Sequence, residues 1–147
     1  MQSLSLSFIY CAPSSANVVT KNKKVGVPGA FTPSCSSQVP GYIEKYNEFK
    51  EKGINEIYVV TVNDAFVTKA WKEKLAPNGT LVRFISDDQA LFVSALGLIL
   101  DATVNLGAPR AKRFVIVSND DVIERIIVEE DSSQVTTTAA DSVLASL

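Results

Sequence analysis

The sequence predicts an α/β fold in which a central mixed β-sheet is flanked by helices. Short β-branched runs alternate along the chain with segments whose apolar residues recur every three or four positions, which is typical of strands that alternate with helices. Towards the C-terminus, the polar turn Asn119-Asp120-Asp121 separates two apolar runs and predicts an antiparallel hairpin. A last helical pattern follows the hairpin, and this order of elements favours helices layered on a sheet.

Length and composition limit what the chain can be. It has 147 residues, of which 46% are hydrophobic and 20% charged, so residues 1–147 are expected to form a single domain with a sizeable core. The net charge of −2 attracts neither nucleic acid nor an acidic membrane, and no apolar run is long enough to span a bilayer. Because there is no histidine, Ser-His-Asp and Cys-His arrangements are excluded, and we expect neither a metal site nor a cofactor.

Serine alternates with leucine in the stretch Met1–Ser7, and Phe8 and Tyr10 follow. Leu4, Leu6, Phe8 and Tyr10 then fall on one face, which predicts a strand with one apolar face. A secretory signal is the alternative, but the stretch lacks a basic start and a continuous apolar core. Residues 11–20 are expected to form a loop, residues 22–24 (Asn-Lys-Lys) a solvated turn, and Val25–Val27 the end of a short strand.

An amphipathic helix is predicted over Ser34–Lys52, because apolar and aromatic residues recur there at spacings of three and four. Pro40 interrupts the hydrogen-bond ladder of this helix and predicts a kink, and Gly53 is expected to close the helix. The β-branched run Ile54–Val62 then predicts a buried, parallel strand.

The second half of the chain continues the alternation. Asn63 or Asp64 is expected to cap a helix that ends at the turn Pro77-Asn78-Gly79. The inner stripe of this helix is predicted to contain Phe66, Val67, Ala70, Trp71 and Leu75. The other predicted elements are a strand over Leu81–Ile85, a helix that Asp87 and Asp88 start and that runs through Leu96, a loop with a short helical piece over residues 97–109, strands over Phe114–Val117 and Val122–Val128, and a last helix that starts at Thr136 or Thr137.

Cys35 follows a turn rich in proline and glycine, at the start of the first long helix. Thr32 suits the N-cap position and Pro33 suits the first turn, where its missing N–H costs nothing. The positive end of the helix dipole then favours an anion at Cys35, and the thiolate is the reactive form of cysteine. The alternative is a buried cysteine that packs as a small apolar residue.

This stretch resembles the peroxiredoxins. Pro28, Thr32 and Cys35 match their Pro-x-x-x-Thr-x-x-Cys signature, and the run PGAFTPSCSSQVPGYIEKY is similar to the type-5 (type II) members, most of all the fungal ones. The similarity continues through KGINEIYVVTVNDAFVTKAW and RAKRFVIV, from about Lys23 onward. The resemblance implies a thioredoxin-like fold, which the strand–turn–helix placement of Cys35 fits, although the Cys-x-x-Cys of thioredoxin itself is absent. The segment before Cys35 is shorter than is usual in the family.

The resemblance also implies a thiol-dependent peroxidase that reduces hydrogen peroxide and alkyl hydroperoxides through a sulfenic acid. Cys35 is then the nucleophile, and the Thr32 hydroxyl and the N–H groups of Ser34 and Cys35 are placed to bind sulfur or peroxide. Pro28 has no N–H and screens the sulfur from water. The expected substrate contacts are Pro28, Gly29, Phe31, Ser34 and Trp71. Phe31 is expected in the pocket wall or a dimer contact, and Trp71 in the core, where it can also line the pocket or a dimer face.

The cation that stabilises the thiolate is expected within Arg110-Ala111-Lys112-Arg113. Arg113 aligns with the active-site arginine of peroxiredoxins, and its guanidinium stays charged and offers a rigid fork of donors. Lys112 alternates with Arg113 and should point to the other side of the strand. The alternative for Arg113 is that it lies at a solvated strand end. For Arg110 a solvated strand end is the favoured interpretation.

Regeneration of the thiol is expected to need an external reductant. The positions at which relatives carry a second, resolving cysteine correspond to Val59 and Thr137 here, and neither holds sulfur. Cys11 matches neither position and is the alternative resolving thiol. We therefore predict a one-Cys mechanism in which glutathione with glutaredoxin, or a thioredoxin, reduces the sulfenic acid.

A second class of function stays open, namely a holdase-type chaperone or a redox-sensing binding protein. By resemblance we expect a homodimer, with no nucleic-acid partner and no membrane span. The tail Ala145-Ser146-Leu147 loosely resembles the peroxisomal address Ser-Lys-Leu, so the expected compartment is the cytoplasm or the peroxisome.

Overall fold

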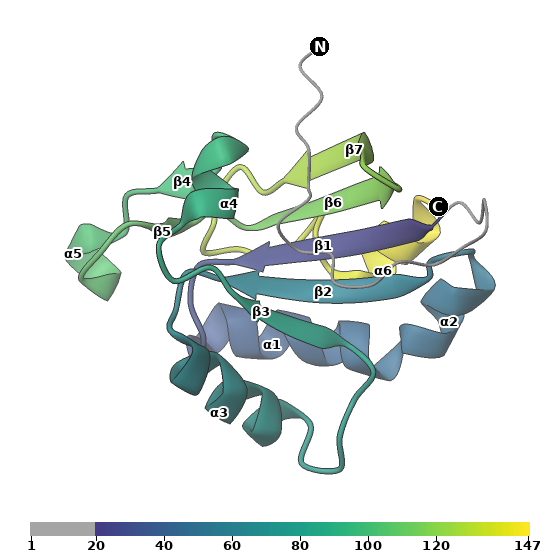
Figure 1. Cartoon of the computed structure of the whole chain (residues 1–147), viewed down its shortest axis with the longest axis horizontal. Helices are drawn as coiled ribbons and strands as arrows, with labels where there is room; N and C mark the ends of the chain where they lie inside the picture. Colours follow the sequence, from purple (N-terminus) through teal and green to yellow (C-terminus); the bar gives the residue numbers. More distant parts are fainter. Residues whose placement is uncertain (1–19) are drawn as a thin grey trace.

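The computed structural model describes residues 20–147 as a central sheet with helices packed on its faces (Figure 1). The strand predicted over Leu4–Tyr10 and the second cysteine, Cys11, lie outside these residues. No helix in the described part is long and apolar enough to cross a membrane.

Seven strands are found in residues 20–147. They are β1 (Lys21–Val27), β2 (Glu56–Thr61), β3 (Arg83–Ser86), β4 (Ile99–Leu100), β5 (Arg110–Ala111), β6 (Phe114–Asn119) and β7 (Val122–Val128). Five of them form one sheet in the order β3-β2-β1-β6-β7, and β4 pairs with β5. β1, β2 and β3 run parallel, whereas β6 is antiparallel to both β1 and β7. The sheet is therefore mixed, which confirms the predicted fold class, and β7 has the predicted bounds.

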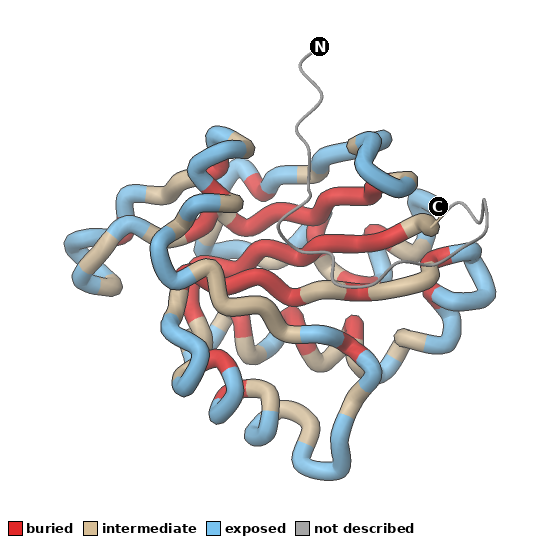
Figure 2. The backbone as a smooth tube through the Cα atoms, in the orientation of Figure 1, coloured by how far each residue is buried: buried red, intermediate tan, exposed pale blue. Residues whose placement is uncertain are grey.

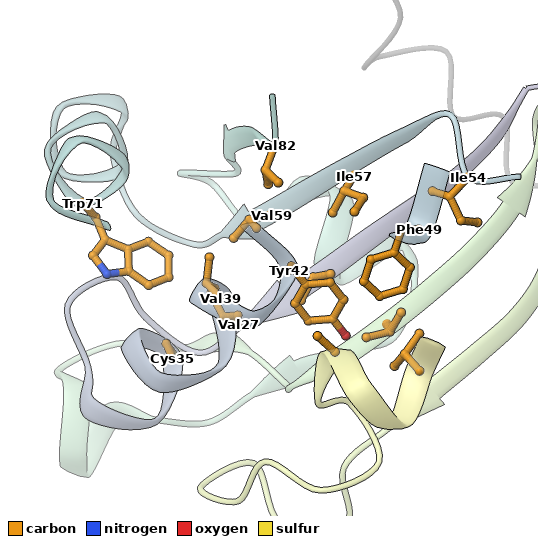
Figure 3. Packing of buried hydrophobic residues seen from close by; sticks show 14 residues of the cluster. Val27, Cys35, Val39, Tyr42, Phe49, Ile54, Ile57, Val59, Trp71 and Val82 are labelled. Carbon is orange, nitrogen blue, oxygen red and sulfur yellow. The ribbon is translucent and has the colours of Figure 1, made fainter. Parts of the chain in front are cut away.

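The helices of the described part are α1 (Pro33–Glu44), α2 (Tyr46–Glu51), α3 (Ala65–Leu75), α4 (Leu91–Ala95), α5 (Thr103–Leu106) and α6 (Ala140–Ala145). The larger apolar cluster joins β1 and β2 to α1, α2, α3 and α6, and a smaller cluster joins α4 to β2 and β6. Buried residues accordingly follow the central strands (Figure 2). Figure 3 shows the larger cluster, which contains Cys35 and Trp71.

The prediction of a solvated turn at residues 22–24 was wrong. These residues belong to β1, the middle strand of the sheet, where residues 22–27 pair with β2 on one side and residues 21–26 with β6 on the other. Two ladders satisfy the backbone of this strand, and pairing on both edges overrides the polarity of its side chains. Lys23 and Lys24 are buried as a result.

The predicted helix over Ser34–Lys52 is divided in two. α1 continues through Pro40 and ends at Glu44, and Lys45 (φ −93°, ψ 14°) turns the chain before α2 begins. This turn allows Phe49 to stack on Tyr42, with ring centroids 5.5 Å apart.

Other boundaries differ for local reasons. In α3 the buried residues are Thr68 and Trp71, whereas Phe66, which was predicted to face inward, is 86% exposed. α4 begins only at Leu91, because Asp87 accepts bonds from the N–H groups of Phe92 and Val93 across a turn. The last helix likewise starts at Ala140, after a segment held by side-chain hydrogen bonds that are described below.

Candidate active site

Cys35 lies in the first turn of α1, directly after the turn that leaves β1. Its side chain is fully buried, within the larger apolar cluster. Ser36 N–H donates to the Thr32 carbonyl, which begins the helix ladder with Cys35 inside it. The predicted placement of the cysteine at a helix start is therefore found in the structure.

Thr32 occupies the N-cap position, but its side chain does not cap the helix. Instead, Thr32 Oγ1 donates to the carbonyl of Gly29 at 2.9 Å. This bond uses the hydroxyl proton and leaves the oxygen lone pairs free to accept a bond from an O–H group. The hydroxyl oxygen is thus free to accept a hydrogen bond, and its proton is not directed at the sulfur.

The turn before Cys35 is fixed by its neighbours. Pro28 and Gly29 are buried, and Ala30 N–H donates to Asn63 Oδ1 at 3.0 Å, which ties the turn to the end of β2. Phe31 has φ 63° in the left-handed region and is 45% exposed. A non-glycine residue pays a steric cost there, which the surrounding bonds must offset.

Arg113 reaches the sulfur. Its Nη2 lies 3.5 Å from Cys35 Sγ, and its side chain is only 1% exposed. Nη1 donates to Gln38 Oε1 at 2.6 Å, and Nε donates to the Ser132 carbonyl at 3.1 Å. Arg110 instead donates to the carbonyls of Val62 and Leu106. Arg113, the predicted cation, is thus the one that lies beside the sulfur, whereas Arg110, for which a solvated strand end was favoured, bonds backbone carbonyls.

The guanidinium of Arg113 has no carboxylate partner within 4.0 Å in residues 20–147. Its acceptors there are a neutral amide, a carbonyl and the cysteine sulfur. A buried cation without a counterion favours a negative charge on the nearest ionisable group. The nearest thiol is that of Cys35, and the guanidinium is placed to interact with its sulfur.

Sequence reasoning missed the residues behind Arg113. Gln38 Nε2 donates to both the carbonyl and Oγ1 of Thr138, each at 3.0 Å. Glu129, also buried, accepts bonds from the N–H and hydroxyl groups of Thr136 and Thr138. Burial alone would raise the pKa of the Glu129 carboxyl, but these four hydrogen bonds outweigh it and lower the pKa to about 2. The signal that could have found Gln38 is a polar residue three positions after Cys35, on the face of α1 that packs inward.

The remaining predicted substrate contacts differ in exposure. Trp71 is fully buried and donates from Nε1 to Ser36 Oγ at 3.1 Å, so it supports the first turn of α1 from inside the core (Figure 3). Ser34 Oγ donates to the Ser133 carbonyl at 2.8 Å. Phe31 is the exposed member of the set, with Lys74 Nζ 5.6 Å from its ring centroid.

Residues 20–147 contain no group of three or more side chains that could hold a metal ion. Cys35 is the one cysteine in this range, and it is free. Val59 is buried in the core and Thr137 is exposed, and neither brings a thiol to the site. The chemistry available here is that of a single sulfur beside a fixed cation.

Comparison with known proteins decides the family. The Redoxin family model matches residues 13–144. The chain is 46% identical over 124 residues to peroxisomal membrane associated protein 20 of Schizosaccharomyces pombe, covering 84% of this chain and 80% of that protein. The chain belongs to the peroxiredoxin family.

Solved structures agree with this assignment. Reduced Prx3 of Vibrio vulnificus in complex with H2O2 superposes with a TM-score of 0.80 and 36% identity, covering 87% of this chain and 82% of that one. Peroxiredoxin 5 of Alvinella pompejana superposes with a TM-score of 0.76 and 31% identity, covering 86% and 78%. The chain is thus a peroxiredoxin of the type-5 kind with a thioredoxin-like fold, and its activity is that of a thiol peroxidase.

Proposed function

We propose that this peroxiredoxin reduces hydrogen peroxide and alkyl hydroperoxides with Cys35 as the nucleophile. The observation that carries the proposal is the 3.5 Å approach of Arg113 Nη2 to Cys35 Sγ inside a buried site. The thiolate attacks the distal oxygen of the peroxide, an S–O bond forms, and the O–O bond breaks. Sulfur is oxidised by two electrons to a sulfenic acid, and the departing alkoxide or hydroxide takes a proton to become an alcohol or water.

Each neighbouring residue has a part in this step. Arg113 stabilises the thiolate and the charge that develops on the leaving oxygen. Thr32 Oγ1, whose proton is bonded to Gly29, accepts the O–H of the hydroperoxide and directs its distal oxygen at sulfur. Pro28 is buried and has no N–H, so it limits the access of water without offering a competing donor.

Rapid peroxide consumption tests this assignment. The wild-type chain with an external thiol should consume hydrogen peroxide, and Cys35→Ser should abolish the reaction because serine has no comparable nucleophile. The matched control is Cys11→Ser, which removes the other thiol in the sequence. Peroxidase activity that survives in Cys35→Ser contradicts the proposal.

The mechanism is proposed to be one-Cys. The support is that Val59 and Thr137 replace the resolving cysteines of relatives, which leaves the sulfenic acid to an external thiol. The attacking thiol forms a mixed disulfide and releases water, and a second thiol then restores Cys35. Full turnover of Cys11→Ser with glutathione and glutaredoxin, or with thioredoxin, is expected, and loss of turnover would assign the resolving role to Cys11.

We further propose a homodimer whose interface includes Phe31. Its support is the exposed ring beside the Cys35 turn, together with the dimers expected by resemblance. Asparagine adopts the left-handed region more readily than most residues, so Phe31→Asn removes the ring with little backbone cost. Sedimentation should show a dimer for the wild type and a weaker dimer for this variant, and an unchanged association constant excludes Phe31 from the interface.

The proposed compartment is the peroxisome. The support is the name of the Schizosaccharomyces pombe relative, a peroxisomal membrane associated protein. A fluorescent protein fused before the chain should co-localise with a peroxisomal marker. A fusion that stays in the cytoplasm contradicts this proposal.

A further inference from the structure

Gln38 joins the active-site cation to the C-terminal segment. Its Oε1 accepts from Arg113 Nη1, and its Nε2 donates to the carbonyl and Oγ1 of Thr138. A guanidinium only donates and a carbonyl only accepts, so these partners dictate the orientation of the amide. The side chain is 3% exposed, and water does not replace these bonds.

Thr138 is itself fixed from two sides. Its N–H and hydroxyl both donate to Glu129 Oε1 at 2.9 Å, and its carbonyl also accepts from the Tyr42 hydroxyl at 2.5 Å. In Figure 3 this hydroxyl points towards the yellow segment that leads into α6. The hydroxyl proton of Thr138 goes to Glu129, so its oxygen can only accept from Gln38, which keeps the amide in one orientation.

Glu129 ends this chain of bonds without touching the guanidinium. Within residues 20–147 no ion pair joins Glu129 to Arg113. The two residues meet through their backbones, where Glu129 N–H donates to the Arg113 carbonyl at 3.0 Å. The negative charge of Glu129 is taken up by two threonines instead. Arg113 therefore receives a neutral acceptor from Gln38 and keeps its charge for the sulfur.

We propose that Glu129, Thr138 and Gln38 form a positioning relay that holds the Arg113 guanidinium against the Cys35 sulfur. The proposal rests on the proposed roles of Cys35 and Arg113. None of the three relay residues touches the reacting atoms. They affect the oxidation of the sulfur only by fixing the position of the Arg113 guanidinium. A small displacement of such a preorganised group is expected to lower the reaction rate markedly.

The chain offers a matched pair of threonines to test this relay. Thr136 and Thr138 donate to the same carboxylate, but only Thr138 also bonds Gln38. Thr138→Val should slow oxidation of Cys35 by hydrogen peroxide by about tenfold, in line with the loss of one or two buried hydrogen bonds. Thr138→Ser restores the hydroxyl and should return the rate to within about twofold of the wild type. Thr136→Val should lower the stability of the fold but leave the rate unchanged.

Stopped-flow oxidation and thiolate absorbance separate the relay from a purely structural role. In the folded Thr138→Val variant both the oxidation rate and the thiolate content at neutral pH should fall. Equal rates for Thr138→Val and Thr136→Val would overturn the relay. If Thr138→Val does not fold, Gln38→Met removes all three side-chain hydrogen bonds of Gln38 at nearly constant volume. A wild-type rate in that variant overturns the relay as well.

Gln38→Glu tests separately whether the acceptor of Arg113 must be neutral. The carboxylate would neutralise Arg113 and face the Thr138 carbonyl, so thiolate content and oxidation rate should both drop, by about tenfold in rate. A faster or unchanged rate contradicts the claim that a neutral acceptor is required. Peroxidase activity in Cys35→Ser would instead overturn the proposed function, and the two failures are therefore distinguishable.

Discussion

Arg113 Nη2 and Cys35 Sγ lie 3.5 Å apart although 78 positions separate the two residues in the chain. The register of the sheet brings them together. Gly26 of β1 pairs with Phe114 of β6, so Arg113 lies beside the point at which β1 ends and the cysteine turn begins. The active-site cation is thus placed by the pairing of two central strands, which are rigid elements of the fold.

Replacing Arg113 tests what this cation contributes. Arg113→Met retains much of the side-chain volume but removes the charge, and the rate of Cys35 oxidation by hydrogen peroxide should fall by about 10²–10³-fold. Arg113→Lys keeps a charge without the fork that reaches both Gln38 and the sulfur, so its rate should be intermediate. Stopped-flow measurement checks both variants, and a methionine variant as fast as the wild type would remove Arg113 from the mechanism.

Lys23 should make stability depend on pH near neutrality. Its Nζ lies 4.1 Å from the Phe49 ring centroid and has no hydrogen-bond partner among residues 20–147. Burial, together with the positive charges of Lys21 and Arg125, lowers the pKa of Lys23 to about 7. The unfolded chain binds this proton up to its ordinary pKa of 10.5, so the free energy of unfolding should rise as the pH increases from about 7 to 10.5.

Below pH 7 the folded chain must carry a buried charge, and the destabilisation is then complete. Lys23→Met should therefore raise the free energy of unfolding at pH 6, by on the order of 2 kcal/mol more than at pH 9. Urea unfolding at the two pH values measures this difference. The exposed lysine variant Lys52→Met is the control, and a Lys23→Met effect that does not change with pH contradicts the account.

Glu129 should make stability depend on pH in the acidic range. Because hydrogen bonds lower the pKa of its carboxyl to about 2 in the folded chain, the stability it contributes is present above pH 4.5 and is lost as the pH falls towards 2. Glu129→Gln should lower the free energy of unfolding at pH 7 by about 1–2 kcal/mol. Unfolding at pH 3 should show a smaller difference, and an equal difference at both pH values would show that the charge of Glu129 is not stabilising.

Local patterns in the sequence were sufficient to predict the cysteine turn. The spacing of Pro28, Thr32 and Cys35 depends on residues that are neighbours in the chain, and it placed Cys35 at the start of a helix, where the structure has it. The apolar run after Arg113 likewise predicted β6, and the family resemblance selected the arginine that lies beside the sulfur.

Local sequence patterns could not predict the residues that hold Arg113 in place. The bond from Gln38 to Arg113 spans 75 positions and the bonds from Gln38 to Thr138 span 100, and no local period records such pairs. Lys23 and Lys24 were misjudged for a related reason. Their polarity indicates a turn, but pairing of β1 with strands on both sides decides their conformation.

The proposed function depends on stabilisation of the Cys35 thiolate by Arg113. Cys11→Ser leaves Cys35 as the sole thiol, so the ultraviolet absorbance of its thiolate can be followed without interference. We predict that this absorbance, measured at a fixed pH, decreases when Arg113→Met is added. An absorbance that Arg113→Met leaves unchanged would contradict a role of Arg113 in stabilising the thiolate.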